Sequence, residues 1–366
     1  MLYGLKQRKI ITSDLSTIDA SKPSFSPLII EPITQEKPKE LLLKITQNKE
    51  VINQYFKDYG IIMFKNFGIQ TVSDYESFLT RLEINLSTEY RPGIAPRNIK
   101  SLSGKSFSST EAPKYMCITP HNEMAYSNYR PSIISFWCKE EPKLYGETPL
   151  TDCGKLYNIL PLKLQKKVCQ PIVFKRKFTN KKTSWDGGTL GGTMWKSSFN
   201  TNNKKEVEEF CKKVGIKYKW DNNENIDTIV EIESILTHTN NKKYIQLQTP
   251  LLGKYIYLYL KNKYPKRFNN SQYNELINSS NYCPPIQYNF LDNTRLTKEE
   301  VEEYMDNILK CTIFPKWKKG DIWLIDNIKY AHSRMNVDTA PKSKREIIAS
   351  LGNFIDIRNL QFTSKI

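Results

Sequence analysis

Apolar and polar residues follow two different periods along this chain of 366 residues. A helical period predicts amphipathic helices over residues 38–60, 72–84, 153–167, 203–214 and 297–314. We expect the first helix to end at Gly60 and the second to begin with Ser73 or Asp74 as its N-cap. The last helix should begin with a capping box that runs from Thr297 to Glu300.

Short apolar runs bounded by turn residues predict strands at residues 61–67, 132–138, 148–152, 320–326 and 345–354, and shorter ones within 226–260. Two long segments carry no such pattern and predict loops, which in compact domains often carry function. They are residues 90–118, rich in Gly, Ser, Pro and Arg, and residues 178–200, with four glycines and two tryptophans. Trp185 and Trp195 of the second loop either line a substrate pocket or anchor the loop locally.

Strands separated by long insertions predict an α+β fold with a mainly β core, decorated by helices and long loops. Residues 1–40 are polar and interrupted by prolines, so we expect an N-terminal arm there. Residues 41–366 then form a single domain with insertions at about 178–315. The chain contains neither an internal repeat nor a low-complexity tract.

The formal net charge is +17 at pH 7, yet the lysines and arginines are dispersed. Dispersed charge favours a solvated lysine surface over a nucleic-acid site, although a positive field would still attract small anions. The seven cysteines form no CxxC motif, which argues against a zinc site of four cysteines. Their odd number and wide spacing also argue against a disulfide framework, so we expect reduced thiols and a cytoplasmic protein. We expect no membrane span and no signal peptide, because long apolar segments are missing.

The chain has only three histidines, and two of them lie in patterns typical of a metal site. His121 precedes Glu123 by two positions, so both side chains would share one face of a strand. His332 follows the predicted strand at 320–326. Two histidines and one carboxylate form the facial triad of Fe(II) oxygenases, which leaves three positions open for 2-oxoglutarate and O₂.

The far carboxylate of 2-oxoglutarate needs a fixed cation, and the planar fork of an arginine holds a carboxylate in bidentate fashion. Arg345 opens the apolar strand that follows His332. If the strands of these two residues are antiparallel neighbours, both side chains would face one cavity. The hydroxyl of Thr148 would complete the clamp.

The order of these motifs resembles the taurine dioxygenase superfamily of Fe(II)- and 2-oxoglutarate-dependent enzymes. The similarity rests on 121-HNEMAYS-127, 136-FWCKEEPKLYGETPLTD-152, the segment from GDIWLIDN to AHSR, and Arg345, and it covers about residues 50 to 353. Within the superfamily, the chain is most similar to the branch of clavaminate synthase and the SyrP-like hydroxylases.

The resemblance implies a double-stranded β-helix (jelly-roll) core, with Fe(II) bound by His121, Glu123 and His332, and 2-oxoglutarate bound by Arg345 and Thr148. The sequence departs from the GGET and HGR segments of that branch, because Tyr145 and Ser333 each replace a glycine. Both departures concern the 2-oxoglutarate clamp, where Arg334 or Lys344 could take the place of Arg345.

The resemblance also implies an enzyme that oxidises a small molecule with O₂ while 2-oxoglutarate is converted to succinate and CO₂. We expect hydroxylation, desaturation or a related C–H oxidation of an amino acid or an amino-acid-derived molecule, either free or tethered to a carrier protein. Related halogenases replace the carboxylate ligand with a small residue, so Glu123 argues against halogenation. The sequence leaves the primary substrate and the oligomeric state open.

Two other functions are compatible with parts of the pattern. One is a catalytically silent jelly roll whose basic surface binds an anionic partner. The other is a zinc hydrolase with two histidines and one glutamate, which ranks last because the helical HExxH motif is missing and Arg345 would have no role.

For nine further residues the sequence leaves open both a role at the active site and a purely structural role. They are His238, Glu147, Arg91, Arg97, Tyr126, Ser127, Asn128, Asp326 and Asn327. A structural role is the more common one for His238, for Glu147 and for scattered arginines. Asp326 and Asn327 would either orient His332 or cap a turn.

Overall fold

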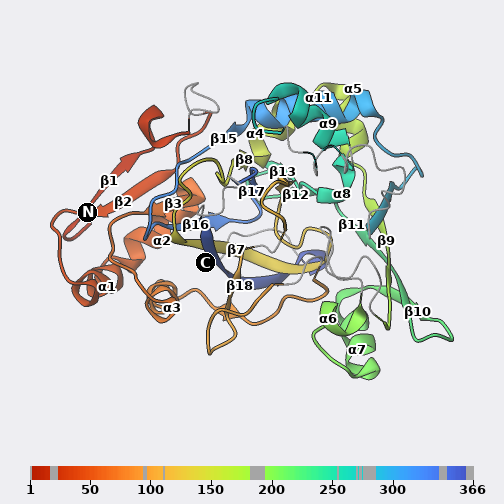
Figure 1. Ribbon diagram of the computed structural model, residues 1–366, viewed down its shortest axis with the longest axis horizontal. Helices are drawn as coiled ribbons and strands as arrows, with labels where there is room; N and C mark the ends of the chain where they lie inside the picture. The colour runs from red at the N-terminus through yellow and green to blue at the C-terminus, as the bar shows by residue number, and fades with distance from the viewer. Residues whose placement is uncertain are drawn as a thin grey trace.

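The computed structural model describes residues 2–16, 24–93, 97–109, 112–181, 194–253, 255–268, 271, 274, 286–337 and 344–359. The fold is mixed α and β with mostly sheet, as the sequence predicts. In Figure 1 the long strands β7 and β18 cross the middle of the molecule, and β8 and β17 of a smaller sheet lie above them. Helices gather at the outer edges of this arrangement.

The large sheet contains eight strands, which are antiparallel to their neighbours except for β2 and β3. Seven follow the order β1 (Leu5–Lys9), β2 (Leu28–Pro32), β3 (Ile61–Phe64), β16 (Ile322–Asp326), β7 (Tyr129–Glu140), β18 (Glu346–Asp356) and β4 (Leu86–Ser87), and β5 (Ser106–Ser108) pairs with β18. Strands β1 and β2 thus lie within the segment expected as an arm. They join the sheet because β2 pairs in parallel with β3.

The central strands of the large sheet are buried on both faces. In β16, Ile322 and Leu324 pack into one hydrophobic cluster, whereas Trp323 and Ile325 pack into another on the opposite face. Helices α1 (Pro38–Gln47), α2 (Lys49–Tyr59) and α3 (Val72–Arg81) cover the first face. Burial on both sides explains why this strand is a continuous apolar run instead of an alternating one.

The smaller sheet has the order β15 (Thr312–Ile313), β8 (Leu150–Asp152), β17 (Tyr330–Arg334) and β6 (Ile118–His121). Leu150 of this sheet shares a hydrophobic cluster with Phe136 and Trp323, so the two sheets pack against each other. The expectation that the strands of His332 and Arg345 are neighbours is wrong. His332 lies in the smaller sheet, and Arg345 immediately precedes β18 of the large one.

The insertion forms a third sheet and most of the remaining helices, which Figure 1 shows at the top and lower right. The sheet has the order β10 (Lys217–Trp220), β11 (Ile226–Ile232), β9 (Ile172–Phe178) and β14 (Ile286–Phe290), and β12 (Ile235–Thr237) pairs with β13 (Lys243–Ile245). The helices are α4 (Cys153–Ile159), α5 (Leu162–Val168), α6 (Trp195–Ser198), α7 (Lys204–Val214), α8 (Thr249–Leu252), α9 (Tyr255–Lys263) and α11 (Lys298–Lys310). The capping box from Thr297 to Glu300 is confirmed.

Two predicted element boundaries are wrong. The predicted helix at 153–167 is two helices, because Leu160 and Pro161 have extended backbone. The N-cap of α3 is Thr71, and Asp74 is its capping-box partner.

The short strands expected within 226–260 are present as β11, β12 and β13. The sequence did not predict the helix at Tyr255–Lys263, whose aromatic and aliphatic side chains pack against α11 and override their strand propensity. Trp185 lies outside the described residues.

The predicted helix at 38–60 ends at Gly60 as expected, but it is interrupted at Asn48. The buried Asn48 side chain accepts a hydrogen bond from the Tyr3 N–H at 2.6 Å and donates to the carbonyl oxygens of Tyr3 at 3.0 Å and Lys44 at 2.7 Å. Asn48 therefore ends α1, begins α2 and ties the N-terminal segment to both helices.

None of the helices within the described residues is both long and apolar enough to cross a membrane. The structure joins none of the six described cysteines in a disulfide.

We predict that Asn48→Ala lowers the free energy of unfolding by about 1–3 kcal/mol, because the Tyr3 N–H and carbonyl lose their buried partner. Chemical denaturation followed by circular dichroism measures the change. The control is Gln47→Ala on the adjacent exposed position, for which we expect a change within about 0.5 kcal/mol. Equal effects of both substitutions would contradict the assigned role of Asn48.

Candidate active site

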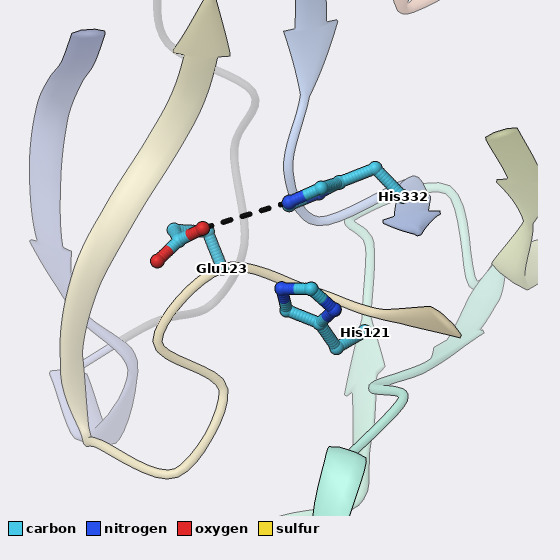
Figure 2. Close-up of side chains that lie close together, drawn as sticks. All are labelled: His121, Glu123 and His332. Atoms are coloured by element: carbon cyan, nitrogen blue, oxygen red, sulfur yellow. Dashed lines mark ion pairs between the residues drawn. The ribbon is translucent and has the colours of Figure 1, made fainter. Parts of the chain in front are cut away.

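The structure brings together the three residues expected as metal ligands, as Figure 2 shows. His121 ends β6 and is paired directly with His332 of the neighbouring strand β17. One potential ligand atom from each of His121, Glu123 and His332 lies within 4.8 Å of the others. The Nε2 atom of His332 is 3.5 Å from the Oε2 atom of Glu123. Among the described residues, this is the one group of three such side chains that could hold a metal ion.

Glu123 does not reach this point along a strand, as the i, i+2 spacing suggested. Strand β6 ends at His121, and the chain then turns through Met124, which has a positive φ of 55°. The turn carries Glu123 toward His332, while the ring of His121 faces the same space from the strand end. The three expected residues therefore come together, but through a turn and not through the strand spacing expected from the sequence.

The hydrogen bonds of the imidazoles are compatible with metal binding. The Nδ1 atom of His121 lies 2.7 Å from the carbonyl oxygen of Thr119, to which it donates, so its Nε2 atom keeps a free lone pair. Burial, and then the neighbouring His332, lower the pKa of His121 to about 4. This imidazole is thus neutral at pH 7, which is the form that binds metals.

Glu123 is buried and pairs with Arg97, for which the sequence favoured a scattered surface charge over a role at the site. Burial alone would raise the pKa of this carboxyl, but the Arg97 guanidinium and the two histidines hold it well below its usual range. Arg97 donates from Nη2 to Oε2 of Glu123 at 2.8 Å. Glu123 is therefore ionised, and the three donors present one full negative charge to a cation.

The backbone of Glu123 is fixed by the side chain of Asn327. The Oδ1 atom of Asn327 accepts the Glu123 N–H at 2.6 Å, and its Nδ2 atom donates to the carbonyl oxygens of Glu123 at 3.0 Å and Pro131 at 2.8 Å. Asp326 instead accepts the N–H groups of Ile328 and Lys329 and so caps the turn into β17. Asp326 therefore has the turn-capping role considered from the sequence, whereas Asn327 orients Glu123 and not His332.

The expected 2-oxoglutarate residues also lie close together. Arg345 donates from Nε to the carbonyl of Gly146 at 2.8 Å and from Nη2 to the Thr148 hydroxyl at 3.0 Å. Trp317 donates to the same hydroxyl oxygen at 3.0 Å, so the hydroxyl hydrogen of Thr148 stays available for a ligand. Burial, and then Arg334, lower the pKa of Arg345 to about 9, which leaves it charged at pH 7.

The two alternative cations for this position are less suitable. Arg334 donates to three backbone carbonyls, those of Ala112, Pro113 and Met116, which engages both ends of its fork. Lys344 is exposed. Arg345 forms no ion pair with any carboxylate of the described residues, so it is the cation with a place for an anionic ligand.

Tyr145, which replaces the first glycine of a GGET segment, makes a packing contact that a glycine could not make. Tyr145 has a φ of 62°, and its ring lies under the guanidinium of Arg267 at 4.0 Å. Arg267 also forms a buried ion pair with Glu147 at 2.8 Å, and Glu147 accepts a hydrogen bond from Ser16. Glu147 is therefore a structural anion and does not line the cavity. The second glycine of the segment, Gly146, is more constrained, because a Cβ atom at this position would lie 2.9 Å from the Cδ atom of Arg345.

A cavity of about 140 Å³ connects the two groups of residues. Its lining includes the three expected metal ligands, Thr148 and Arg345, together with Tyr90, Arg97, Tyr126, Phe136 and Ile347. Tyr126 thus faces the cavity, whereas Ser127 and Asn128 do not line it. His238 lines a separate hollow on the surface, and Trp195 is buried against Trp220.

Residues 30–350 match the taurine catabolism dioxygenase TauD, TfdA family, and the chain belongs to this family. The resemblance inferred from the sequence motifs is confirmed. Family membership, with three metal-binding side chains gathered at one point, also confirms the expected enzyme class, an iron- and 2-oxoglutarate-dependent dioxygenase.

Two curated proteins are similar over most of their length. A clavaminate synthase-like protein of Arabidopsis thaliana is 23% identical over 84% of this chain and 86% of its own. The dapdiamide synthesis protein DdaC of Enterobacter agglomerans is 23% identical over 83% of this chain and 89% of its own. Among solved structures, PvcB of Pseudomonas aeruginosa superposes with a TM-score of 0.52 over 96% of this chain and 91% of its own. At 8% identity it is similar in fold alone.

We predict that Asn327→Ala lowers the affinity for Co(II) or Fe(II) by about 10- to 100-fold, because Glu123 loses the partner that fixes its backbone. Titration of the metal-free protein under anaerobic conditions measures this affinity. Asn307→Ala serves as the control, since it removes another buried asparagine, on α11, away from the cavity. Wild-type affinity in the Asn327 variant would contradict the positioning role.

Proposed function

We propose that this protein uses His121, Glu123 and His332 to bind Fe(II), and Arg345 and Thr148 to bind 2-oxoglutarate, and that it hydroxylates an amino acid or amino-acid-derived small molecule. One observation carries the proposal. The three donors face the same cavity as a partly buried arginine, Arg345, that has no carboxylate partner among the described residues.

The donor set fits iron. One carboxylate and two imidazoles suit Fe(II), and a facial arrangement leaves adjacent positions for 2-oxoglutarate and O₂. When bound, the iron would supply the oxidative chemistry that converts 2-oxoglutarate to succinate and CO₂ and oxidises a C–H bond of the substrate. The carboxylate of Glu123 occupies the position that a halogenase would leave for chloride, which favours hydroxylation or desaturation.

The protein's own residues would hold the 2-oxoglutarate at its far end. Arg345 is kept in place by the Gly146 carbonyl and the Thr148 hydroxyl oxygen, so its fork loses little freedom on binding a carboxylate. The hydroxyl hydrogen of Thr148 can donate to the same carboxylate. Phe136 and Ile347 line the cavity between the two ends and help to exclude water from it.

The two packed sheets support the finer assignment of the fold as a double-stranded β-helix, in which the smaller sheet carries His121 and His332 and the large sheet leads from Arg345. We propose further that residues 41–366 form one domain, with the insertion at about 178–315 packed onto it.

The proposed substrate is a small molecule, either free or carried on a protein. The names of two similar proteins support this class, since one acts in dapdiamide synthesis and another, PvcB, is described as an oxygenase of an isonitrile synthetic pathway. Six described cysteines without a disulfide among them support a reducing, cytoplasmic location. The main competing function is a silent jelly roll that binds a partner, and the complete set of donors argues against it.

Anaerobic absorption spectroscopy with Fe(II) and 2-oxoglutarate tests the proposed function. We expect a weak visible charge-transfer band in the wild-type protein that is lost in His121→Ala and in Glu123→Ala, because each removes one ligand. His238→Ala is the matched control and should keep the band, since His238 lies outside the cavity. A wild-type protein without the band would favour the silent jelly roll.

We predict that Arg345→Gln raises the 2-oxoglutarate concentration for half-saturation of this band by about 10- to 100-fold, since a charge-assisted bidentate contact is lost. Lys344→Gln on the exposed neighbouring residue should leave the value unchanged. If the two variants behave alike, another residue holds the far carboxylate of 2-oxoglutarate.

A further inference from the structure

The charges that line the cavity are unbalanced in favour of cations. Arg97, Arg334 and Arg345 contribute three guanidinium groups, and Glu123 contributes the one carboxylate. A divalent iron and the doubly charged 2-oxoglutarate would cancel each other, so binding both would leave the excess of positive charge unchanged. A cavity of this kind favours a further anion over a neutral or cationic molecule.

Two of the three arginines are already engaged. Arg345 belongs to the 2-oxoglutarate clamp, and Arg334 is held by three backbone carbonyls. Arg97 remains, and it is the cation that stands beside the proposed metal ligand Glu123.

Half of the Arg97 fork has no partner. Its side chain is 8% exposed, and its guanidinium lies over the Tyr90 ring at 4.5 Å from the ring centroid. Nη2 donates to Glu123, whereas the buried Nη1 atom has no hydrogen-bond partner among the described residues. A buried donor without a partner costs free energy, which a bound acceptor would recover.

A second donor without a partner lies on the same cavity. The hydroxyl of Tyr126 is buried and has no partner among the described residues. Burial, followed by the nearby Tyr90 and Glu123, raises the pKa of Tyr126 well above its usual range, so the hydroxyl keeps its proton and can donate.

The chain around Arg97 is anchored on both sides. Before it, Arg176 of β9 donates from Nη2 to the carbonyl oxygen of Gly93 at 2.6 Å. After it, the Asn98 N–H donates to the Ser108 hydroxyl at 3.0 Å, and the Asn98 carbonyl accepts the Ser108 N–H at 2.8 Å. Ser108 lies in β5 of the large sheet, so Arg97 is held between the third sheet and the large sheet.

We propose that Arg97 and the hydroxyl of Tyr126 bind a carboxylate of the primary substrate, so that the substrate class is a small carboxylic acid. The inference rests on the proposed function, since it takes the cavity to be the place of oxidation. Arg97 is an unsuitable partner for the far carboxylate of 2-oxoglutarate, because it contacts the proposed metal ligand Glu123 directly. Arg345, which donates to the Thr148 hydroxyl, is the arginine proposed to bind that far carboxylate.

The test uses butyrate and butyramide, two probes of similar shape that differ in charge. Saturation-transfer NMR measures the binding of each probe to the full-length protein, both metal-free and loaded anaerobically with Fe(II) and saturating 2-oxoglutarate. We expect the loaded wild-type protein to bind butyrate at least about tenfold more tightly than butyramide, as a charge-assisted hydrogen bond would give. Arg97→Gln should abolish this preference.

Three variants make the test specific. Tyr126→Phe removes a hydroxyl without a partner, so it should fold normally and weaken butyrate binding about three- to tenfold. Arg345→Gln should keep the preference for butyrate while 2-oxoglutarate binding weakens. In Arg97→Gln, the half-saturating concentration of 2-oxoglutarate should stay within about threefold of the wild-type value.

Equal binding of butyrate and butyramide to the loaded wild-type protein would overturn the inference, as would a preference that persists in both Arg97→Gln and Tyr126→Phe. A rise of tenfold or more in the 2-oxoglutarate requirement of Arg97→Gln would reassign this arginine to the co-substrate and also overturn it. If the wild-type protein shows no Fe(II) band at all, the proposed function fails. In that case, comparing butyrate with butyramide on the metal-free protein still tests the role of Arg97. The Nη1 atom of Arg97 has no hydrogen-bond partner among the described residues, whether or not iron binds.

Discussion

The buried carboxylate of Glu123 is the constraint on which the centre of this molecule depends. An isolated charge in a protein interior is strongly unfavourable, and this one is stabilised by Arg97 and by the two imidazoles beside it. His121 is neutral at pH 7, which favours the binding of a divalent cation beside the carboxylate. The proposed metal site is thus an electrostatic feature of the fold as well as a set of donors.

The backbone around this carboxylate is held by three side-chain amides, of which two come from distant parts of the chain and the third is that of the neighbouring Asn122. Asn327, at the end of β16, binds both the N–H and the carbonyl of Glu123. Asn122 accepts the N–H of Leu247, and Gln248 donates to the carbonyl of Ala125. The residues at 247 and 248 belong to the insertion, so the insertion contributes directly to the structure of the candidate site. It holds the turn that carries Glu123, and a buried network with its partners satisfied is rigid.

The sequence predicts the features that depend on local pattern. Strand β16 is recognisable because burial on both faces makes it continuously apolar, and the capping box of α11 lies within four consecutive residues. His121, Glu123, His332, Thr148 and Arg345 could be named because each lies in a motif typical of one enzyme family. The fold class and the expected site residues followed from such patterns.

The features that the sequence did not predict depend on contacts between distant residues. The interruption at Asn48 arises from bonds to Tyr3, far away in the chain. The helix at Tyr255–Lys263 exists because α11 offers it an apolar surface. Arg97 was one of many dispersed cations, and only the packing of its loop brings it to Glu123. No local signal distinguishes such an arginine from one on the surface.

Two of the arginines that line the cavity, Arg345 and Arg97, are held by partly different parts of the fold, and this difference has a functional consequence. Arg345 and Thr148 are built on the two core sheets, whose strands cannot move without disturbing a core that is close-packed on both faces. Arg97 is anchored on one side by Arg176 of β9, which binds the Gly93 carbonyl, and on the other by Ser108 of the large sheet, which binds Asn98. A change at Arg176 would therefore act first on the residue proposed to bind the substrate. Varying such a contact is one way in which a single fold can carry the same chemistry to different substrates.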